Sequence, residues 1–254
     1  MIDSHCHIND KAFENYESMY IKEAYANGVN TFLVVGYDLD SSKKAIEISE
    51  GFECCFAAIG IHPSDSKRFE LNVLEKIDLL AKNNKVVAVG EIGLDYYWDK
   101  EENIKNKQKE FFIKQIEIAN KHDLPISIHC RDAYEDCLNI LKLHPVKKGG
   151  IMHCYGGSKE MIGEFIKLGF LIGIGGVVTF KNAVKMKEVA AAVPSDKYVL
   201  ETDSPYLAPT PFRGQRNHSK YLYLVRDEIA KLRNCSPETI EEETNKNFKN
   251  LFKL

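Results

Sequence analysis

The sequence predicts an α/β protein, a single (β/α)8 barrel with an additional C-terminal helix, and three observations support this prediction. The chain has 254 residues, close to the usual length of such a barrel. Eight short runs rich in Val, Ile, Leu and Gly show little polar alternation, as strands do when a parallel sheet is covered on both faces. An amphipathic stretch follows each run, so the pattern is that of eight strand–helix units closed into a TIM barrel.

The elements follow one another without interruption. The expected strands cover residues 1–6, 30–35, 54–59, 86–90, 125–129, 150–153, 170–174 and 198–201. The expected helices cover residues 17–27, 41–50, 71–82, 103–121, 133–143, 159–168, 183–192 and 221–232, with the additional helix at 237–248. The clearest helix is 103–121, where apolar residues recur at helical spacing among Lys and Glu.

We expect one domain over residues 1–254, because the sequence contains no Pro/Gly/Ser-rich linker and no low-complexity tract. The main alternative is an open, doubly wound sheet, which alternates strands and helices in the same way. Such a sheet usually has a glycine-rich phosphate turn after its first strand. Here the first strand ends in His5-Cys6-His7 instead.

Composition narrows the class of protein. The net charge of −3 argues against a protein that coats duplex nucleic acid, although an enzyme could still bind one nucleic-acid end locally. Seven cysteines, an odd number, suggest reduced thiols, and Cys6, Cys130 and Cys154 alternate with histidines and should face the helices. We see no leader and no membrane-length apolar run, and expect a cytoplasmic enzyme with no membrane contact and no obligate protein partner.

Histidines and carboxylates stand at the predicted strand ends, where barrels of this kind place their active sites. They come from five different strands: His5, His7, Glu91, His129, His153 and Asp203. Imidazole and carboxylate together suit a divalent metal, and six ligands exceed the needs of one tetrahedral ion. We therefore expect a two-metal centre with Glu91 as the bridge. A lone histidine at a strand end is more often a packed core residue, and we assign no chemistry to His122 and His144 at helix ends.

Several segments together resemble one family. These are Ile2-Asp3-Ser4-His5-Cys6-His7, Gly60-Ile61-His62-Pro63, Gly90-Glu91-Ile92-Gly93-Leu94-Asp95-Tyr96, His129-Cys130-Arg131, His153-Cys154-Tyr155 and Glu201-Thr202-Asp203-Ser204-Pro205-Tyr206-Leu207-Ala208-Pro209. In this order they resemble the TatD family of metal-dependent deoxyribonucleases, over residues 2 to about 220. Any one motif alone would be weak evidence.

The resemblance implies an amidohydrolase-like barrel, a pair of divalent ions (Zn, Mg or Mn) held by the six residues above, and hydrolysis of DNA phosphodiesters from single-stranded or frayed ends. Two departures from the family pattern are visible. Ser219 stands where the family usually has proline, and Tyr155 replaces a more common Phe. Neither is a ligand position, so they bear only on substrate preference.

We assign roles to the remaining site residues as hypotheses. Asp203 and Glu91 are the expected catalytic carboxylates, with Asp203 accepting a proton from the attacking water. Two divalent ions outweigh these two carboxylates, which favours an anionic substrate. His62, at the third strand end, should hold a phosphate oxygen away from the metals, or else fix a turn with Pro63. Glu201 should orient a ligand from outside the coordination sphere, or else sit in the core.

Three further residues are expected to touch substrate. Tyr97, beside the single tryptophan Trp98, should help form a nucleobase wall, or else pack its own loop. Arg213 and Arg216 lie in the segment after the eighth strand, where barrels often bind phosphate. A guanidinium matches phosphate oxygens with paired hydrogen bonds, so one of the two should hold a substrate phosphate, unless it serves only to tie the loop down.

Other functions remain open at this point. The same centre could hydrolyse another ester or amide, such as the aminoacyl ester of a mischarged tRNA. Many cyclic-amide hydrolases use a carboxylated lysine at the fourth strand, where this chain has Glu91. A catalytically inactive scaffold protein would be expected to lack one or more of the ligands, and none is missing.

Overall fold

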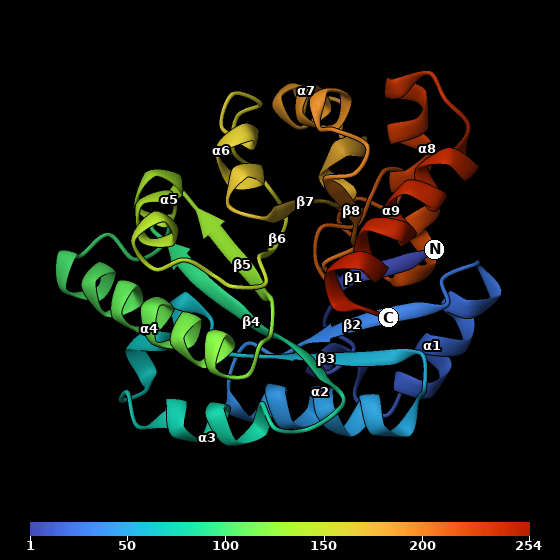
Figure 1. Ribbon diagram of the computed structural model, residues 1–254. Helices are drawn as coiled ribbons and strands as arrows, with labels where there is room; N and C mark the ends of the chain where they lie inside the picture. The colour runs from blue at the N-terminus through green and yellow to red at the C-terminus, as the bar shows by residue number, and fades with distance from the viewer.

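The computed structural model describes residues 1–254 and contains one sheet of eight parallel strands. Each strand pairs with the next along the chain, in the order β1 to β8. In Figure 1 the helices surround the strands. The strands are β1 (Ile2–Cys6), β2 (Thr31–Val35), β3 (Cys55–Ile59), β4 (Val86–Asp95), β5 (Ile126–Arg131), β6 (Gly150–Met152), β7 (Phe170–Ile174) and β8 (Tyr198–Leu200).

One helix follows each strand, and a ninth ends the chain. The helices are α1 (Glu17–Ala26), α2 (Leu39–Gly51), α3 (Val73–Leu80), α4 (Glu102–Lys121), α5 (Tyr134–Leu143), α6 (Ile162–Lys167), α7 (Val184–Ala192), α8 (Leu222–Arg233) and α9 (Pro237–Phe252). The (β/α)8 barrel predicted from the sequence is confirmed, with most boundaries shifted by only a few residues. None of the helices combines the length and apolar character needed to cross a bilayer.

The fourth strand is the one large departure, because it continues to Asp95 and does not end at Gly90 as expected. Gly93 makes the extension possible. It lies opposite His129 in the β4–β5 ladder with φ at +135°, and a Cβ there would collide with the His129 carbonyl. The extension carries Asp95 to the rim of the barrel beside Arg131.

Alternate residues of the strands fill two apolar regions. Phe32 and Val34 belong to the large cluster that includes residues of the surrounding helices. Leu33 and Val35 belong instead to a small cluster together with Phe248 of α9. Helix α9 also contacts β8 and β1. The extra C-terminal helix therefore packs onto the barrel interior, which is filled with side chains, and the polar residues gather at the other ends of the strands.

The barrel closes between β8 and β1 by an irregular seam. The strand ladder runs only from β1 to β8, and the closing hydrogen bonds come from residues at and beyond the strand ends. The Asp203 amide donates to the His5 carbonyl at 2.9 Å, and the His7 amide donates to the Ser204 carbonyl at 2.8 Å. The first and last strands are thus joined at the residues predicted to bind metal.

The cysteines follow the sequence expectation only in part. All seven thiols are free. Cys6 is fully buried in the large apolar cluster, as expected, and donates to the Leu33 carbonyl. Cys130 also packs in that cluster, yet it borders the cavity at the open end of the barrel. Cys154 borders the same cavity, because β6 ends at Met152 and the chain turns at Cys154 with φ of +43°, so strand alternation no longer applies.

Candidate metal centre

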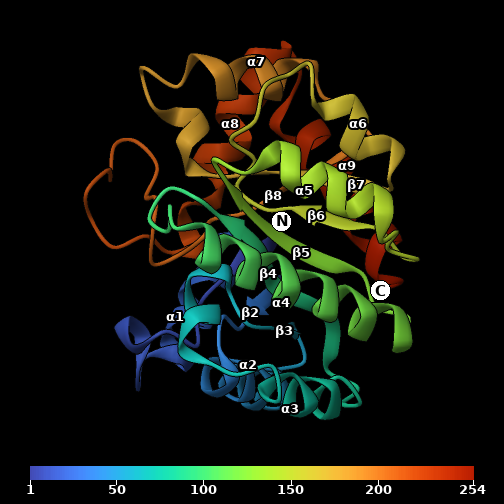
Figure 2. The ribbon, with the colours of Figure 1, turned by 90° about the vertical axis from the view of Figure 1, so that its left-hand side faces the viewer.

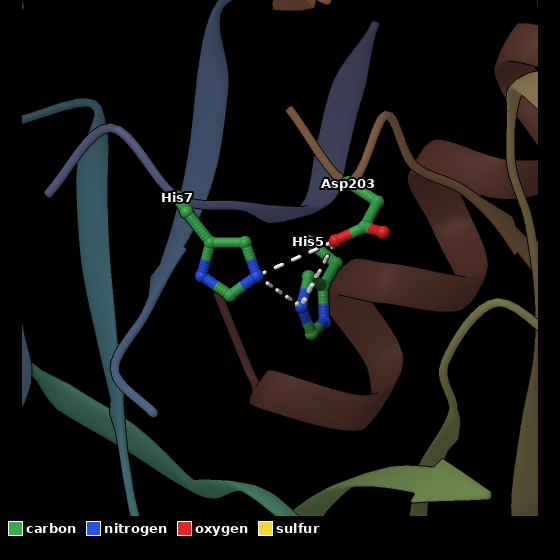
Figure 3. A group of neighbouring side chains, drawn as sticks. All are labelled: His5, His7 and Asp203. Atoms are coloured by element: carbon green, nitrogen blue, oxygen red, sulfur yellow. Dashed lines mark hydrogen bonds and ion pairs between the residues drawn. The ribbon is translucent and has the colours of Figure 1, made fainter. Parts of the chain in front are cut away.

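Six side chains from five strands meet at the open end of the barrel. His5 lies on β1 and His7 directly follows it, and Glu91 and His129 lie on β4 and β5. His153 directly follows β6, and Asp203 lies three residues beyond the end of β8. Figure 3 shows His5, His7 and Asp203 with their polar atoms directed at one another. His5 and His7 Nε2 atoms are 3.2 Å apart, and Asp203 Oδ1 lies 3.4 Å from His7 Nε2 and 3.9 Å from His5 Nε2.

Glu91 lies between two groups of histidines. Its Oε2 is 3.5 Å from His5 Nε2 and 3.7 Å from His7 Nε2. Its Oε1 is 2.9 Å from His129 Nδ1 and 3.7 Å from His153 Nε2. One carboxylate oxygen therefore faces each pair of imidazoles.

Each of the four histidines has a polar neighbour at the nitrogen that points away from this centre. His7 Nδ1 donates to the Val35 carbonyl at 2.8 Å, and His129 Nε2 donates to Asp95 Oδ2 at 2.9 Å. His5 Nδ1 lies 3.3 Å from the Ser127 hydroxyl. His153 Nδ1 lies 3.1 Å from Glu201 Oε2. With a proton on the outer nitrogen, every ring directs its lone pair at the carboxylates in the centre.

Glu201 occupies the position expected of an orienting group. Its side chain is fully buried, one oxygen accepts a hydrogen bond from the Cys154 amide at 2.6 Å, and the other faces His153. Gly173 on β7 makes the room, because a Cβ there would overlap the Glu201 carboxylate. Glu201 is therefore held by the Cys154 amide on one side and lies beside the His153 ring on the other.

The buried groups have strongly displaced pKa values. Burial opposes charge on His153, but Glu201, Asp203 and Glu91 outweigh it and raise the pKa of His153 to about 10. Burial also opposes charge on His129, and Asp95 and Glu91 raise its pKa to about 9. Burial favours a neutral Glu91, but the surrounding imidazoles hold the pKa of this carboxyl well below its usual range. The centre thus stabilises positive charge among its carboxylates.

The donor set fits divalent metal ions. Nitrogen and oxygen atoms of His5, His7 and Asp203 lie within 4.8 Å of one another, as do those of His5, Glu91 and His153 and those of His62, Glu91 and His129. Two imidazole nitrogens that face each other at 3.2 Å, with carboxylate oxygens alongside, repel unless a cation lies between their lone pairs. Buried carboxylates likewise require positive charge nearby.

His62 lies closer to the centre than the sequence suggested. Its Nε2 is 3.7 Å from Glu91 Oε1, so His62 adjoins one of the predicted ligands, and its distance from the metals stays a prediction. The reason is the turn at Pro63, in which His62 Nδ1 accepts a hydrogen bond from the Ser64 amide at 3.2 Å. Burial and the charge of His129 lower the pKa of His62 to about 3, so the ring is neutral and carries its proton on Nε2. His62 therefore presents an N–H donor, in contrast to the four histidines above.

A cavity of about 890 Å³ opens above the six side chains. Tyr37 and Tyr206 line one part of it, next to the His7 ring, and their hydroxyls share Asp10 Oδ2. Trp98 lines another part, with about 69% of its surface exposed. The site thus combines a polar floor with aromatic walls, which suits a substrate that has both charged and planar parts.

Three predicted substrate contacts do not line this cavity. Arg216 donates to the Ala12 carbonyl at 2.6 Å, and Arg213 stacks over the Phe180 ring. Both lie on the long segment between β8 and α8, which loops away from the barrel in Figure 2. Tyr97 also lies outside the cavity lining and contacts the guanidinium of Arg131. Sequence position placed these residues near the site, but tertiary contacts direct their side chains elsewhere.

Sequence reasoning missed the residues that surround the histidines. Asp95 was expected in a loop, and only the extension of β4 brings it to His129. Ser127 and Arg131 each lie two residues from His129 on β5, so strand alternation would have placed all three on one face. That alternation was the available signal.

Comparison with known proteins agrees with this geometry. The family model described as TatD related DNase matches residues 2–253. The protein named "Uncharacterized metal-dependent hydrolase YabD" of Bacillus subtilis is 43% identical over 100% of this chain and 99% of its own length. The "3'-5' ssDNA/RNA exonuclease TatD" of Klebsiella pneumoniae is 31% identical, over 99% of this chain and 97% of its own.

Solved structures give the same result for the fold. The crystal structure of YjjV, a TatD homologue from Escherichia coli K12, superposes with a TM-score of 0.94 at 29% identity, covering 100% of this chain and 98% of that one. The barrel fold, the polar centre and the matches over the whole length agree with one another. The chain therefore belongs to the family of TatD-related DNases and is a metal-dependent hydrolase.

Proposed function

We propose that this hydrolase cleaves phosphodiester bonds of DNA, starting from single-stranded or frayed ends, with two divalent ions. The observation that carries the proposal is the position of Glu91, which directs one oxygen to each of two histidine groups beneath a cavity with aromatic walls. Paired ions suit phosphodiester hydrolysis, because they stabilise charge on both the attacking and the leaving oxygen. The exonuclease name of the Klebsiella pneumoniae relative supports the same substrate class.

The residues divide into two sets around Glu91. His5, His7 and Asp203 would hold one ion, and His129 with His153 would hold the other, with Glu91 shared between them. Zn, Mn and Mg are the candidates, since nitrogen and oxygen donors together accept several divalent ions. When bound, the ions supply a nucleophile from water at neutral pH and neutralise charge on the phosphate.

The chain's own groups perform the proton transfers. Asp203 accepts the proton released by the attacking water at its carboxylate, which faces the centre beyond the end of β8, and returns that proton to the leaving oxygen. His62 donates its Nε2–H to a phosphate oxygen, because its Nδ1 is engaged by the Ser64 amide. Glu201 holds the His153 ring in one orientation through Nδ1.

A metal-by-substrate matrix on metal-free protein tests the proposal. Zn, Mn and Mg are each added back and assayed on end-labelled single-stranded DNA, duplex DNA, RNA and an aminoacyl ester. We expect release of mononucleotides from single-stranded DNA and from the frayed ends of duplexes. Hydrolysis of the aminoacyl ester with no cleavage of any nucleic acid would overturn the proposal in favour of ester hydrolysis.

A further inference from the structure

The cavity above the metal centre contains a single arginine or lysine. Nineteen residues line it, and among them only Arg131 carries a permanent positive charge. Asp65 and Asp132 line its rim as well, so the wall of the cavity offers little other attraction to an anion. Any phosphate of the substrate that lies beyond reach of the metal ions therefore has one permanently cationic partner available.

The strand fixes where Arg131 points. It lies two residues after His129 on β5, so both side chains leave the same face of the strand. Its backbone is about 6–7 Å further along the strand toward the open end. Arg131 thus stands above the metal centre, at the next level of the cavity.

An aromatic platform holds the guanidinium in place. Its Cζ atom lies 3.7 Å from the centre of the Tyr97 ring and 5.8 Å from that of Trp98. The two rings pack against each other edge-to-face, with centroids 4.6 Å apart. A stacked guanidinium keeps its N–H edge free for hydrogen bonds, so the platform orients Arg131 without consuming its donors.

Nothing in the protein uses those donors. Other arginines are engaged: Arg68 with Asp65, Arg226 with Glu241, and Arg233 with Glu243. The carboxylate nearest to Arg131 in the strand ladder, Asp95, is occupied by His129 and by the Tyr97 amide. Arg131 itself is exposed and forms neither an ion pair nor a side-chain hydrogen bond. An oriented, unpaired guanidinium in a cavity is a ready anion site.

We infer that Arg131 forms a second phosphate subsite, which binds the phosphate next to the one being hydrolysed while the intervening base contacts Trp98. This inference rests on the proposed function and adds a requirement to it: an efficient substrate carries two neighbouring phosphates. Arg131 is in this respect a specificity-determining residue and takes no part in the proton transfers.

Kinetics on two substrates test the subsite. One substrate is a short thymidine oligonucleotide, and the other is bis(p-nitrophenyl) phosphate, which has a single phosphodiester. We expect Arg131→Gln to raise KM for the oligonucleotide about 10- to 100-fold, as for loss of a charge-assisted hydrogen bond, with little change in kcat. KM and kcat for bis(p-nitrophenyl) phosphate should stay unchanged. Arg131→Lys should give an intermediate KM, because it keeps the charge and loses the paired geometry.

Arg213→Gln is the matched control, since Arg213 also stacks on an aromatic ring but lies outside the cavity. It should leave both substrates unaffected. Equal losses on both substrates after Arg131→Gln would mean that Arg131 supports the site structurally, and would overturn the subsite. Absence of wild-type cleavage of either phosphodiester would instead overturn the proposed nuclease function.

A binding measurement keeps the two ideas separate. Trp98 is the only tryptophan, so its fluorescence reports on the subsite in metal-free protein. Titration with the same oligonucleotide should change the Trp98 emission. Arg131→Gln should weaken binding, and it should lower the slope of log Kd against log salt concentration by about the amount expected for one lost phosphate contact. An unchanged affinity and salt dependence in Arg131→Gln would overturn the subsite whatever the catalytic activity.

Discussion

The Thr202 hydroxyl donates a hydrogen bond of 2.6 Å to Asp3 Oδ2, and this bond joins the last strand of the barrel to the first. The Thr202 amide donates to Asp3 Oδ1 at 3.0 Å, and the Ser219 hydroxyl donates to the same carboxylate. Asp3 is fully buried. It therefore joins β1 to β8 where the strand ladder stops, directly below the residues that face the metal centre.

Ser219 gives this chain a feature that a proline at the same position could not supply. Its amide donates to the Tyr20 hydroxyl at 2.8 Å, and proline has no amide hydrogen. This departure from the family pattern thus contributes to the seam between β1 and β8.

Removing the hydroxyl of Thr202 should loosen this seam. We expect Thr202→Val to lower the free energy of unfolding by about 1.5–3 kcal/mol, the range for a hydrogen bond to a charged group. Urea unfolding of the metal-free protein measures this loss. Thr31→Val on β2 is the control, because the Thr31 hydroxyl makes no hydrogen bond within the protein. This control change should lower the free energy of unfolding by less than about 0.5 kcal/mol. Equal effects of the two changes would contradict a special role for the Asp3–Thr202 bond.

Asp203→Asn should separate catalysis from stability. The amide preserves the shape of the side chain but cannot accept a proton, so kcat should fall about 10²- to 10⁴-fold. The metal-free protein should remain folded, because Asp203 lies at the open end of the barrel and outside the apolar core. Asp132→Asn, an exposed carboxylate at the rim of the same cavity, serves as the control and should retain activity. A variant of Asp203 that cleaves DNA at the wild-type rate would exclude it as the proton acceptor.

Glu201→Gln should weaken metal binding without unfolding the protein. The neutral amide no longer supports charge on His153, and loss of such an orienting partner typically costs about 10- to 100-fold in metal affinity. Titration of metal-free protein against a competing chelator gives the affinity directly. Glu243→Gln is a matched change far from the centre, where Glu243 accepts from the Tyr198 hydroxyl. If both variants bind metal as tightly as wild type, Glu201 is a core residue only.

His218 should make stability depend on pH. Burial, together with the charges of Lys220 and Arg216, lowers the pKa of His218 to about 4, although Glu23 opposes this, and the ring stacks on Tyr20. Between pH 6.5 and 4 the unfolded chain binds the proton and the folded one does not, so stability falls as the pH falls through this window. The slope for one such group is about 1.4 kcal/mol per pH unit at most.

Unfolding in urea at pH 7.5, 6 and 5 measures this dependence. His218→Asn keeps an acceptor for the Lys220 amide and does not titrate. Between pH 6.5 and 5 its free energy of unfolding should therefore fall by about 1–2 kcal/mol less than that of the wild type. His144→Asn at the end of α5 should behave as wild type. An identical pH dependence in wild type and His218→Asn would show that other groups produce it.

The strands and the six central residues could be predicted because their information is local. A buried parallel strand needs a run of apolar residues, and the first few residues after that run must emerge at the open end, as His153 and Asp203 do. The length of β4 could not be predicted, since Gly93 reads as a strand breaker unless its close approach to His129 is known. The directions of two arginine side chains could not be predicted for another reason. Arg213 and Arg216 are directed by Phe180 and Ala12, which lie far away in sequence.

The seam also determines when the site can exist during protein synthesis. His5 and His7 leave the ribosome among the first residues, yet Asp203 and the Thr202 hydroxyl that holds Asp3 follow only after all eight strands have been made. A nascent chain that lacks β8 has an open barrel edge and an incomplete set of ligands. Acquisition of hydrolytic activity therefore follows translation of the segment beyond the eighth strand.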